Sequence, residues 1–152
     1  MTRALVWIVE ETWEATVAQA AAALPHDAEV TLLHVAPADV EEIAQGARAG
    51  LLGRPRHRPG PHEEALPAIS GAAAAALLGE AQERLGRAAT RDARRGRAER
   101  EVLAAAVGMD LLILARDGDR TLPGPHSLGP QTRFVVDHAP CAVLLLWPHP
   151  PG

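Results

Sequence analysis

The sequence contains no lysine, no asparagine and no tyrosine, and it has a single cysteine. Without lysine the chain cannot form a P-loop, whose phosphate-binding motif requires one, and it cannot hold a substrate as a lysine Schiff base. The lone Cys141 has no internal partner for a disulfide, which is typical of a reducing compartment. We therefore expect a cytoplasmic protein, in which Cys141 is an inert core thiol.

Long apolar runs are also absent. None approaches the ~20 residues of a membrane-spanning helix, and the opening residues lack the basic segment and apolar core of a secretory leader. The net charge of −4 argues against a dedicated nucleic-acid binder. Seven arginines do cluster between residues 84 and 100, but acidic residues are interleaved with them and no aromatic residue is near for base stacking. We expect neither a membrane nor a nucleic acid as partner. The clustered residues are Arg84, Arg87, Arg91, Arg94, Arg95, Arg97 and Arg100.

Short apolar runs alternate with helical patterns along the chain. The runs that indicate strands are 4–9, 29–36, 110–115 and 142–147, and the segments that indicate helices are 13–24, 72–87, 97–107 and 130–137. The last two runs have no polar alternation, as in strands of a parallel sheet that are buried on both faces. At 152 residues the chain is long enough for one domain. We predict a single doubly wound α/β domain over residues 1–152.

Two segments do not follow this pattern. Residues 38–70 are rich in proline and glycine and have almost nothing to bury. We predict a mobile insertion there, most mobile over 45–68, with a short helix around 39–48. Residues 88–95 lack β-branched alternation, so helix propensity alone extends the preceding helix through them.

The ending "GPQTRFVVDHAPCAVLLL" resembles the close of universal stress protein domains, which run Gly-Ser, a short helix and then "HAPCPVLVV". "DLLILARDG" is similar to their strand and loop "DLIVMGSRG", "VTLLHVAP" to their second strand, and "LVWIVEET", more loosely, to their opening "ILVPVDGS". The resemblance covers nearly the whole chain except 38–70. It implies a five-stranded parallel sheet of strand order 3-2-1-4-5 with helices on both faces. It also implies an edge strand at 88–95 in place of the helix, and charge on an edge strand opposes pairing with other chains.

The resemblance further implies a nucleotide site, because one class of the family binds ATP where the carboxyl ends of the strands meet. Their loop has Gly, two residues, Gly, nine residues and then Gly-Ser or Gly-Thr. Here the first glycine is Ala115, ten residues separate Gly118 from Gly129, and Pro130 replaces the serine, which removes a hydroxyl and a backbone donor. On the adenosine side, Glu10 replaces the usual Asp. The implied nucleotide-binding residues are Ile8, Val9, Glu10, Val35, Ala115, Gly118, Gly129, Pro130, Gln131 and Thr132.

Two hypotheses stay open at this point. The first is a universal stress-type regulatory module that binds ATP or AMP weakly, with little or no catalysis and no metal beyond nucleotide-associated Mg²⁺. The second is a scaffold or partner-binding dimer on the same fold that has lost its ATP site. Both predict a homodimer through residues 142–147, because an apolar edge strand is otherwise left unpaired.

Three other features suggest chemistry less well. Ser127 in "PHSLG" imitates a nucleophile elbow, but it lies far from its strand and Pro125 replaces the first glycine, so a polar loop is favoured over a hydrolase. Four possible metal ligands lie in the insertion, where no scaffold orients them; they are His57, His62, Glu63 and Glu64. We interpret His34 as a core or ladder histidine and His138 as part of the connection to the last strand.

Overall fold

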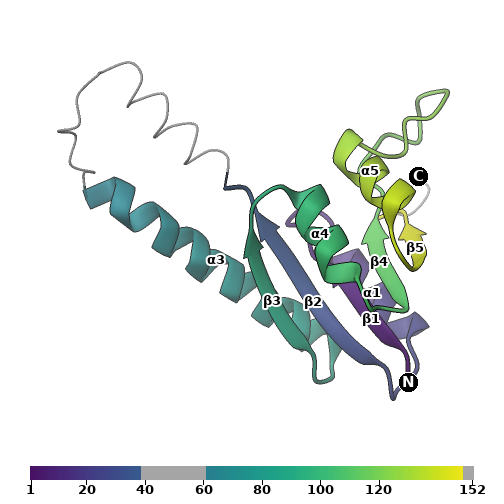
Figure 1. The fold of residues 1–152 in the computed structure, drawn as a ribbon, viewed down its shortest axis with the longest axis horizontal. Coiled ribbons are helices and arrows are strands. Elements are labelled where there is room, and N and C mark those ends of the chain that lie inside the picture. Colours follow the sequence, from purple (N-terminus) through teal and green to yellow (C-terminus); the bar gives the residue numbers. More distant parts are fainter. Residues whose placement is uncertain (39–60, 149–152) are drawn as a thin grey trace.

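The computed structural model describes residues 1–38 and 61–148, with side chains from residue 71 onward in the second range. Its five strands form one sheet of order β3-β2-β1-β4-β5, and every neighbouring pair is parallel (Figure 1). This confirms the fold and the strand order implied by the resemblance. The strands are β1 (Arg3–Trp7), β2 (Glu29–Ala36), β3 (Thr90–Arg95), β4 (Leu111–Ala115) and β5 (Ala142–Leu146).

Helices cover both faces of this sheet (Figure 1). They are α1 (Trp13–Ala23), α3 (Pro61–Leu85), α4 (Ala98–Ala106) and α5 (Pro130–His138). The side chains of β1 alternate between the two faces. Val6 packs in one buried cluster with residues of α1 and α3, whereas Leu5 and Trp7 pack in the other with residues of α4 and α5. None of the described helices is both long enough and apolar enough to cross a membrane.

The charged segment 90–95 is the edge strand β3, so the helix expected there from propensity is wrong. Its residues pair in register with β2 from Thr31 opposite Thr90 to Ala36 opposite Arg95. The open edge of β2 offers backbone hydrogen bonds that propensity does not count. Arg94 also lies between two carboxylates, with its Nε 3.0 Å from Asp92 and its Nη1 3.4 Å from Glu101. Half-buried ion pairs thus let a charged sequence occupy an edge strand.

Helix α3 begins at Pro61, inside the segment that the sequence predicts as an insertion. Residues 61–70 of that segment are helical in the structure, whereas its mobility stays a prediction. Proline is favoured at the first position of a helix, and acidic residues are favoured in its first turn. The segment "PHEE" at the start of α3 has both features. In Figure 1 the first part of α3 projects beyond the sheet. The expected mobility over 45–60 and the short helix at 39–48 lie outside the described residues.

Strand β5 is less buried in this chain than its apolar sequence suggests. Ala142 is exposed and the other four residues are half-buried. The physical reason is its position, because β5 lies at the edge of the sheet and pairs only with β4. Burial on both faces is thus not achieved within one chain.

Candidate functional site

Two adjoining cavities lie at the carboxyl ends of the strands. A cavity of about 230 Å³ lies between the ends of β1 and β2 and the start of α4, and one of about 140 Å³ lies between the ends of β1 and β4 and the start of α5. Both are lined by Trp7, Val9 and Gln131. The strand order reverses at β1, and ligands of open α/β sheets bind in the crevice at such a switch point. We name the pair of cavities the crevice.

Trp7 separates the two parts of the crevice. It is the last residue of β1, and its side chain is only 7% exposed. The indole packs in the cluster that includes Val35, Val102 and Leu114, and it also lines both cavities. An apolar strand that ends in tryptophan indicates core, so the sequence offered no signal that this residue also shapes a cavity.

His34 connects β2 to the segment that follows β1. Its Nδ1 is 2.9 Å from the carbonyl oxygen of Ile8, and the half-buried ring lines the 230 Å³ cavity. The backbone N–H of Ile8 donates to the carbonyl of Leu33 at 2.7 Å, which extends the contact between the strands by one residue. His34 therefore holds the wall of the cavity, consistent with its interpretation as a ladder histidine.

Two carboxylates line the crevice, those of Glu11 and Asp117, and Glu10 contributes neither. Glu10 is exposed and lines neither cavity, whereas Glu11 lines the 140 Å³ cavity. A tight turn follows β1, because the carbonyl of Val9 accepts hydrogen bonds from the N–H groups of Thr12 and Trp13 at 3.1 and 2.9 Å. Glu11 is exposed as well, and sequence position alone does not show which of two adjacent glutamates borders the cavity.

Asp117 occupies the start of α5. Its Oδ1 accepts a hydrogen bond from the backbone N–H of Gly129 at 2.7 Å, and its Oδ2 accepts one from the hydroxyl of Thr132 at 2.8 Å. Gly129 is the residue that precedes the first turn of α5, and Thr132 is only 4% exposed. The amino end of a helix carries a partial positive charge. An anionic group of the protein itself is thus already bound there.

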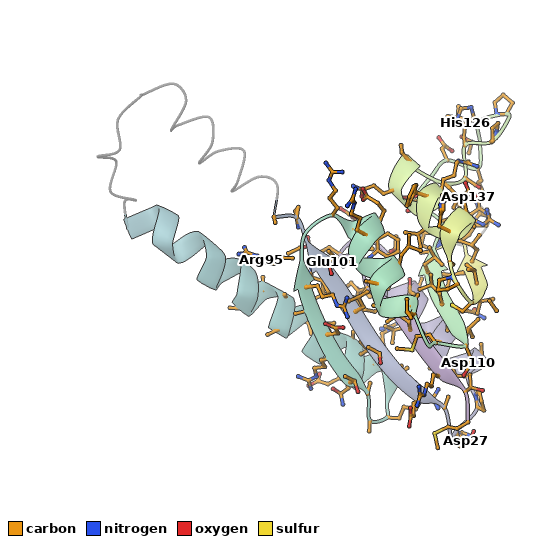
Figure 2. All side chains as sticks on the ribbon, in the orientation of Figure 1. Asp27, Arg95, Glu101, Asp110, His126 and Asp137 are labelled. Carbon is orange, nitrogen blue, oxygen red and sulfur yellow. The ribbon has the colours of Figure 1, made fainter. Side chains whose placement is uncertain are left out.

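The rest of the connection between β4 and α5 folds back on itself. The N–H of Gly118 donates to the carbonyl of Ser127 at 3.0 Å, and the N–H of Asp119 donates to the carbonyl of His126 at 2.8 Å. A Cβ on Gly118 would lie 1.8 Å from the carbonyl oxygen of His126, so only glycine fits. Arg116 Nη1 donates to the hydroxyl of Ser127 at 2.8 Å. His126 labels this loop in Figure 2, at the end of the molecule opposite Asp27 and Asp110. Ser127 is thus part of a folded polar loop, as the sequence favoured.

A wider groove of about 660 Å³ adjoins the crevice along this loop. Three carboxylates line it, from Glu11, Asp117 and Asp119, together with the guanidinium groups of Arg116 and Arg120. Both guanidinium groups lie near the Trp147 ring, at 5.5 and 4.5 Å from its centroid. Hydrogen bonds from the hydroxyl and the backbone N–H of Thr121 hold the pKa of Asp119 below its usual value. The groove therefore has a mixed charge with an ionised carboxylate at its mouth.

The structure brings together six of the ten residues that the resemblance implies, and they line the two cavities: Ile8, Val9, Val35, Ala115, Gln131 and Thr132. Four lie elsewhere. Glu10 is exposed, Gly118 lines the groove, Gly129 packs against Asp117, and Pro130 lines a separate depression beside Phe134.

Sequence reasoning missed Trp7, Glu11 and Asp117 as parts of this region. The available signal for Asp117 was an acidic residue in the loop before a helix that begins with glycine and proline. No group of three or more His, Cys, Asp or Glu in the described part of the chain is arranged to hold a metal. The candidate ligand His57 and the side chains of residues 62–64 lie outside that part.

Comparisons with known proteins agree with this architecture. The model of the universal stress protein family matches residues 2–146. The universal stress protein UspA from Lactobacillus plantarum is 19% identical, with a TM-score of 0.57 over 95% of this chain and 96% of that chain. A family protein from Burkholderia pseudomallei is also 19% identical, with a TM-score of 0.57 over 97% and 96%.

A third similar structure is a universal stress protein in complex with cAMP. It is 15% identical, with a TM-score of 0.62 over 97% of this chain and 98% of that chain. No curated protein sequence matches the chain. At these identities the structural similarity shows the shared fold.

Proposed function

This chain belongs to the universal stress protein family, and from that premise we propose that it is a regulatory module that binds an adenine nucleotide or nucleoside weakly. We propose little or no catalysis, and a role in a stress response in the cytoplasm. Any Mg²⁺ would arrive with the phosphates of the nucleotide.

The observation that carries this proposal is the 230 Å³ cavity at the switch point of the sheet. Its walls are apolar where Val9, Val35 and the indole of Trp7 line it, and polar where His34 and Gln131 do. A planar apolar base with polar edges suits such walls. A universal stress protein of similar fold has been solved in complex with cAMP, which supports a ligand of this class.

Weak binding follows from the size of the crevice. Typical ligand pockets have about 300–1,000 Å³, whereas the cavities on the two sides of Trp7 have about 230 and 140 Å³. A complete nucleotide therefore has to extend into the adjoining groove of about 660 Å³, where the N–H groups of Gly118 and Asp119 already donate within the loop. The shortage of free donors there lowers the affinity.

Calorimetry with ATP, AMP and cAMP tests the proposal. We expect dissociation constants of roughly 10⁻⁵–10⁻³ M, equivalent to about 4–7 kcal/mol. Val9→Glu should abolish binding, because Val9 lines both cavities. Val107→Glu is the matched control, since Val107 is 70% exposed and lies outside the crevice. Absence of binding to adenosine as well as to these three nucleotides, or submicromolar binding of ATP, would contradict this function.

The second candidate is a dimeric scaffold without a nucleotide, and β5 favours it. Leu146 directs its carbonyl toward β4, where it accepts a hydrogen bond from the N–H of Arg116 at 2.7 Å. Successive residues of a strand direct their backbone groups to opposite sides. Val143 and Leu145 therefore direct theirs away from β4, along a half-buried apolar edge. We propose that a second copy of the chain pairs with this edge through residues 142–147.

Sedimentation of Val143→Pro tests the dimer. Proline removes one outward N–H and leaves the pairing with β4 intact. We expect a dimeric native protein and a monomeric variant, whereas Val143→Ala retains the N–H and should stay dimeric. A native monomer at micromolar concentration rules out this pairing.

A further inference from the structure

We propose that Asp117 sets the class of ligand that the crevice accepts. Its carboxylate occupies the anion position at the start of α5, so the crevice takes an adenine nucleoside with little or no phosphate in preference to a nucleoside triphosphate. This inference rests on the proposed function, which it deepens by naming the ligand.

The hydrogen bonds of Asp117 consume donors that a phosphate would need. Helix amino ends bind phosphate through free backbone N–H groups and the positive end of the helix dipole. Here the N–H of Gly129 and the hydroxyl of Thr132 both donate to Asp117, at 2.7 and 2.8 Å. A phosphate would have to displace a carboxylate that is covalently part of the same loop.

Two further backbone positions near the start of α5 offer no free N–H group to a phosphate. The N–H of Gly118 donates to the carbonyl of Ser127 at 3.0 Å. Pro130, the first residue of α5, has no N–H. Three backbone positions that the family resemblance assigns to phosphate are therefore engaged within the protein or lack a donor.

Three carboxylates and two guanidinium groups line the groove beside the loop, so its net charge opposes a polyphosphate. Glu11 lines the 140 Å³ cavity together with Asp117, and Asp119 joins them in the adjoining groove. A polyphosphate there would face three carboxylates at close range, and Arg116 already donates to the hydroxyl of Ser127. The 230 Å³ cavity, by contrast, is lined by neither Asp117 nor another carboxylate. An uncharged nucleoside is therefore not opposed at that end.

Calorimetry with adenosine, AMP and ATP on native protein and on Asp117→Asn measures this selectivity. We expect the native affinity to fall from adenosine to ATP by ~10-fold or more. Asp117→Asn removes the charge and frees a donor, and hydrogen bonds to charged groups are worth about 10- to 100-fold in affinity. The variant should therefore gain ~10-fold or more for ATP and change less than ~2-fold for adenosine.

Asp119→Asn is the matched control, because it makes the same charge change in the same groove while the carboxylate of Asp119 accepts its hydrogen bonds from Thr121 and not from the start of α5. It should change ATP affinity less than ~3-fold. If Asp117→Asn does not fold, Asp117→Ser replaces it, because serine also removes the charge and keeps a small polar side chain. Tighter native binding of ATP than of adenosine, or equal gains from the two asparagine variants, overturns the inference while the proposed function stands.

A thermal-shift experiment with pyrophosphate distinguishes failure of the proposed function from failure of the proposed role of Asp117. If no form binds adenosine, the proposed function fails. Pyrophosphate should still raise the Tm of Asp117→Asn and leave that of the native protein unchanged, because it needs only the anion position. The same response of both proteins to pyrophosphate overturns the role of Asp117.

Discussion

The two parts of the crevice are built from different kinds of backbone. The nucleoside part is formed by the ends of β1 and β2, and the phosphate part by the loop between β4 and α5. Strand residues find their backbone partners in the neighbouring strands, so the side chains at the strand ends are free to line a cavity. The loop has no such neighbour, and the N–H groups of Gly118, Asp119 and Gly129 bond within it.

We infer from this difference that the proposed site can lose its phosphate part and keep its nucleoside part. Buried backbone groups have to be paired, and a loop that pairs its own groups has fewer left for phosphate. The cavity beside Val35 depends on sheet geometry, which the fold preserves. Erosion of the glycine pattern therefore affects the phosphate part first.

The strongest test of the nucleoside part is Trp7→Ala. Removal of a buried tryptophan leaves a void, and we expect the free energy of unfolding to fall by about 3–5 kcal/mol in urea denaturation. Trp13→Ala is the control on the opposite face of the sheet, where Trp13 is half-buried and only flanks the core cluster. Its loss should be clearly smaller. Equal losses would show that Trp7 is not the support of the crevice.

Gly118→Ala tests the folded loop. The new Cβ would lie 1.8 Å from a backbone oxygen, so the two sides of the loop have to separate, at a cost of about 1–3 kcal/mol. Hydrogen exchange at the amide of Asp119 should become fast. Gly71→Ala provides the contrast, because nothing lies within 4 Å of its Cβ in α3, and alanine should stabilise that helix by up to ~1 kcal/mol. An unchanged exchange rate at Asp119 would mean that the loop is open in solution.

Pro130→Ser has the smallest expected effect. It restores an N–H and a hydroxyl at the start of α5, but Asp117 still holds Gly129, so we expect the affinity for ATP to rise by less than ~10-fold in calorimetry. In the Asp117→Asn background the same change should give a larger gain. If Pro130→Ser alone raised the affinity for ATP as much as the double change does, then Pro130, and not the carboxylate of Asp117, would limit ATP binding.

The charged strand β3 shows how far local sequence can be misleading. Propensity predicts helix for "TRDARR", whereas the family resemblance predicts an edge strand, and the structure confirms the strand. The residues that decide it are not local, because β3 forms along the open edge of β2 and Arg94 pairs with Glu101 of α4. The family resemblance reflects these long-range contacts, whereas the helix propensity of a short segment does not.

The strand order came from the family resemblance, which includes the "HAPC" step before β5. The sequence by itself determined the parallel sheet, through short apolar runs without polar alternation. Local hydrophobicity is sufficient for this because a strand covered on both faces excludes polar residues. Only the tertiary structure decided that Glu11 and not Glu10 lines the crevice, and that Asp117 binds groups 12 and 15 residues further along. The physical reason is that the path of a turn decides which side chain borders the cavity, and a hydrogen bond across a loop depends on where its two ends meet in space.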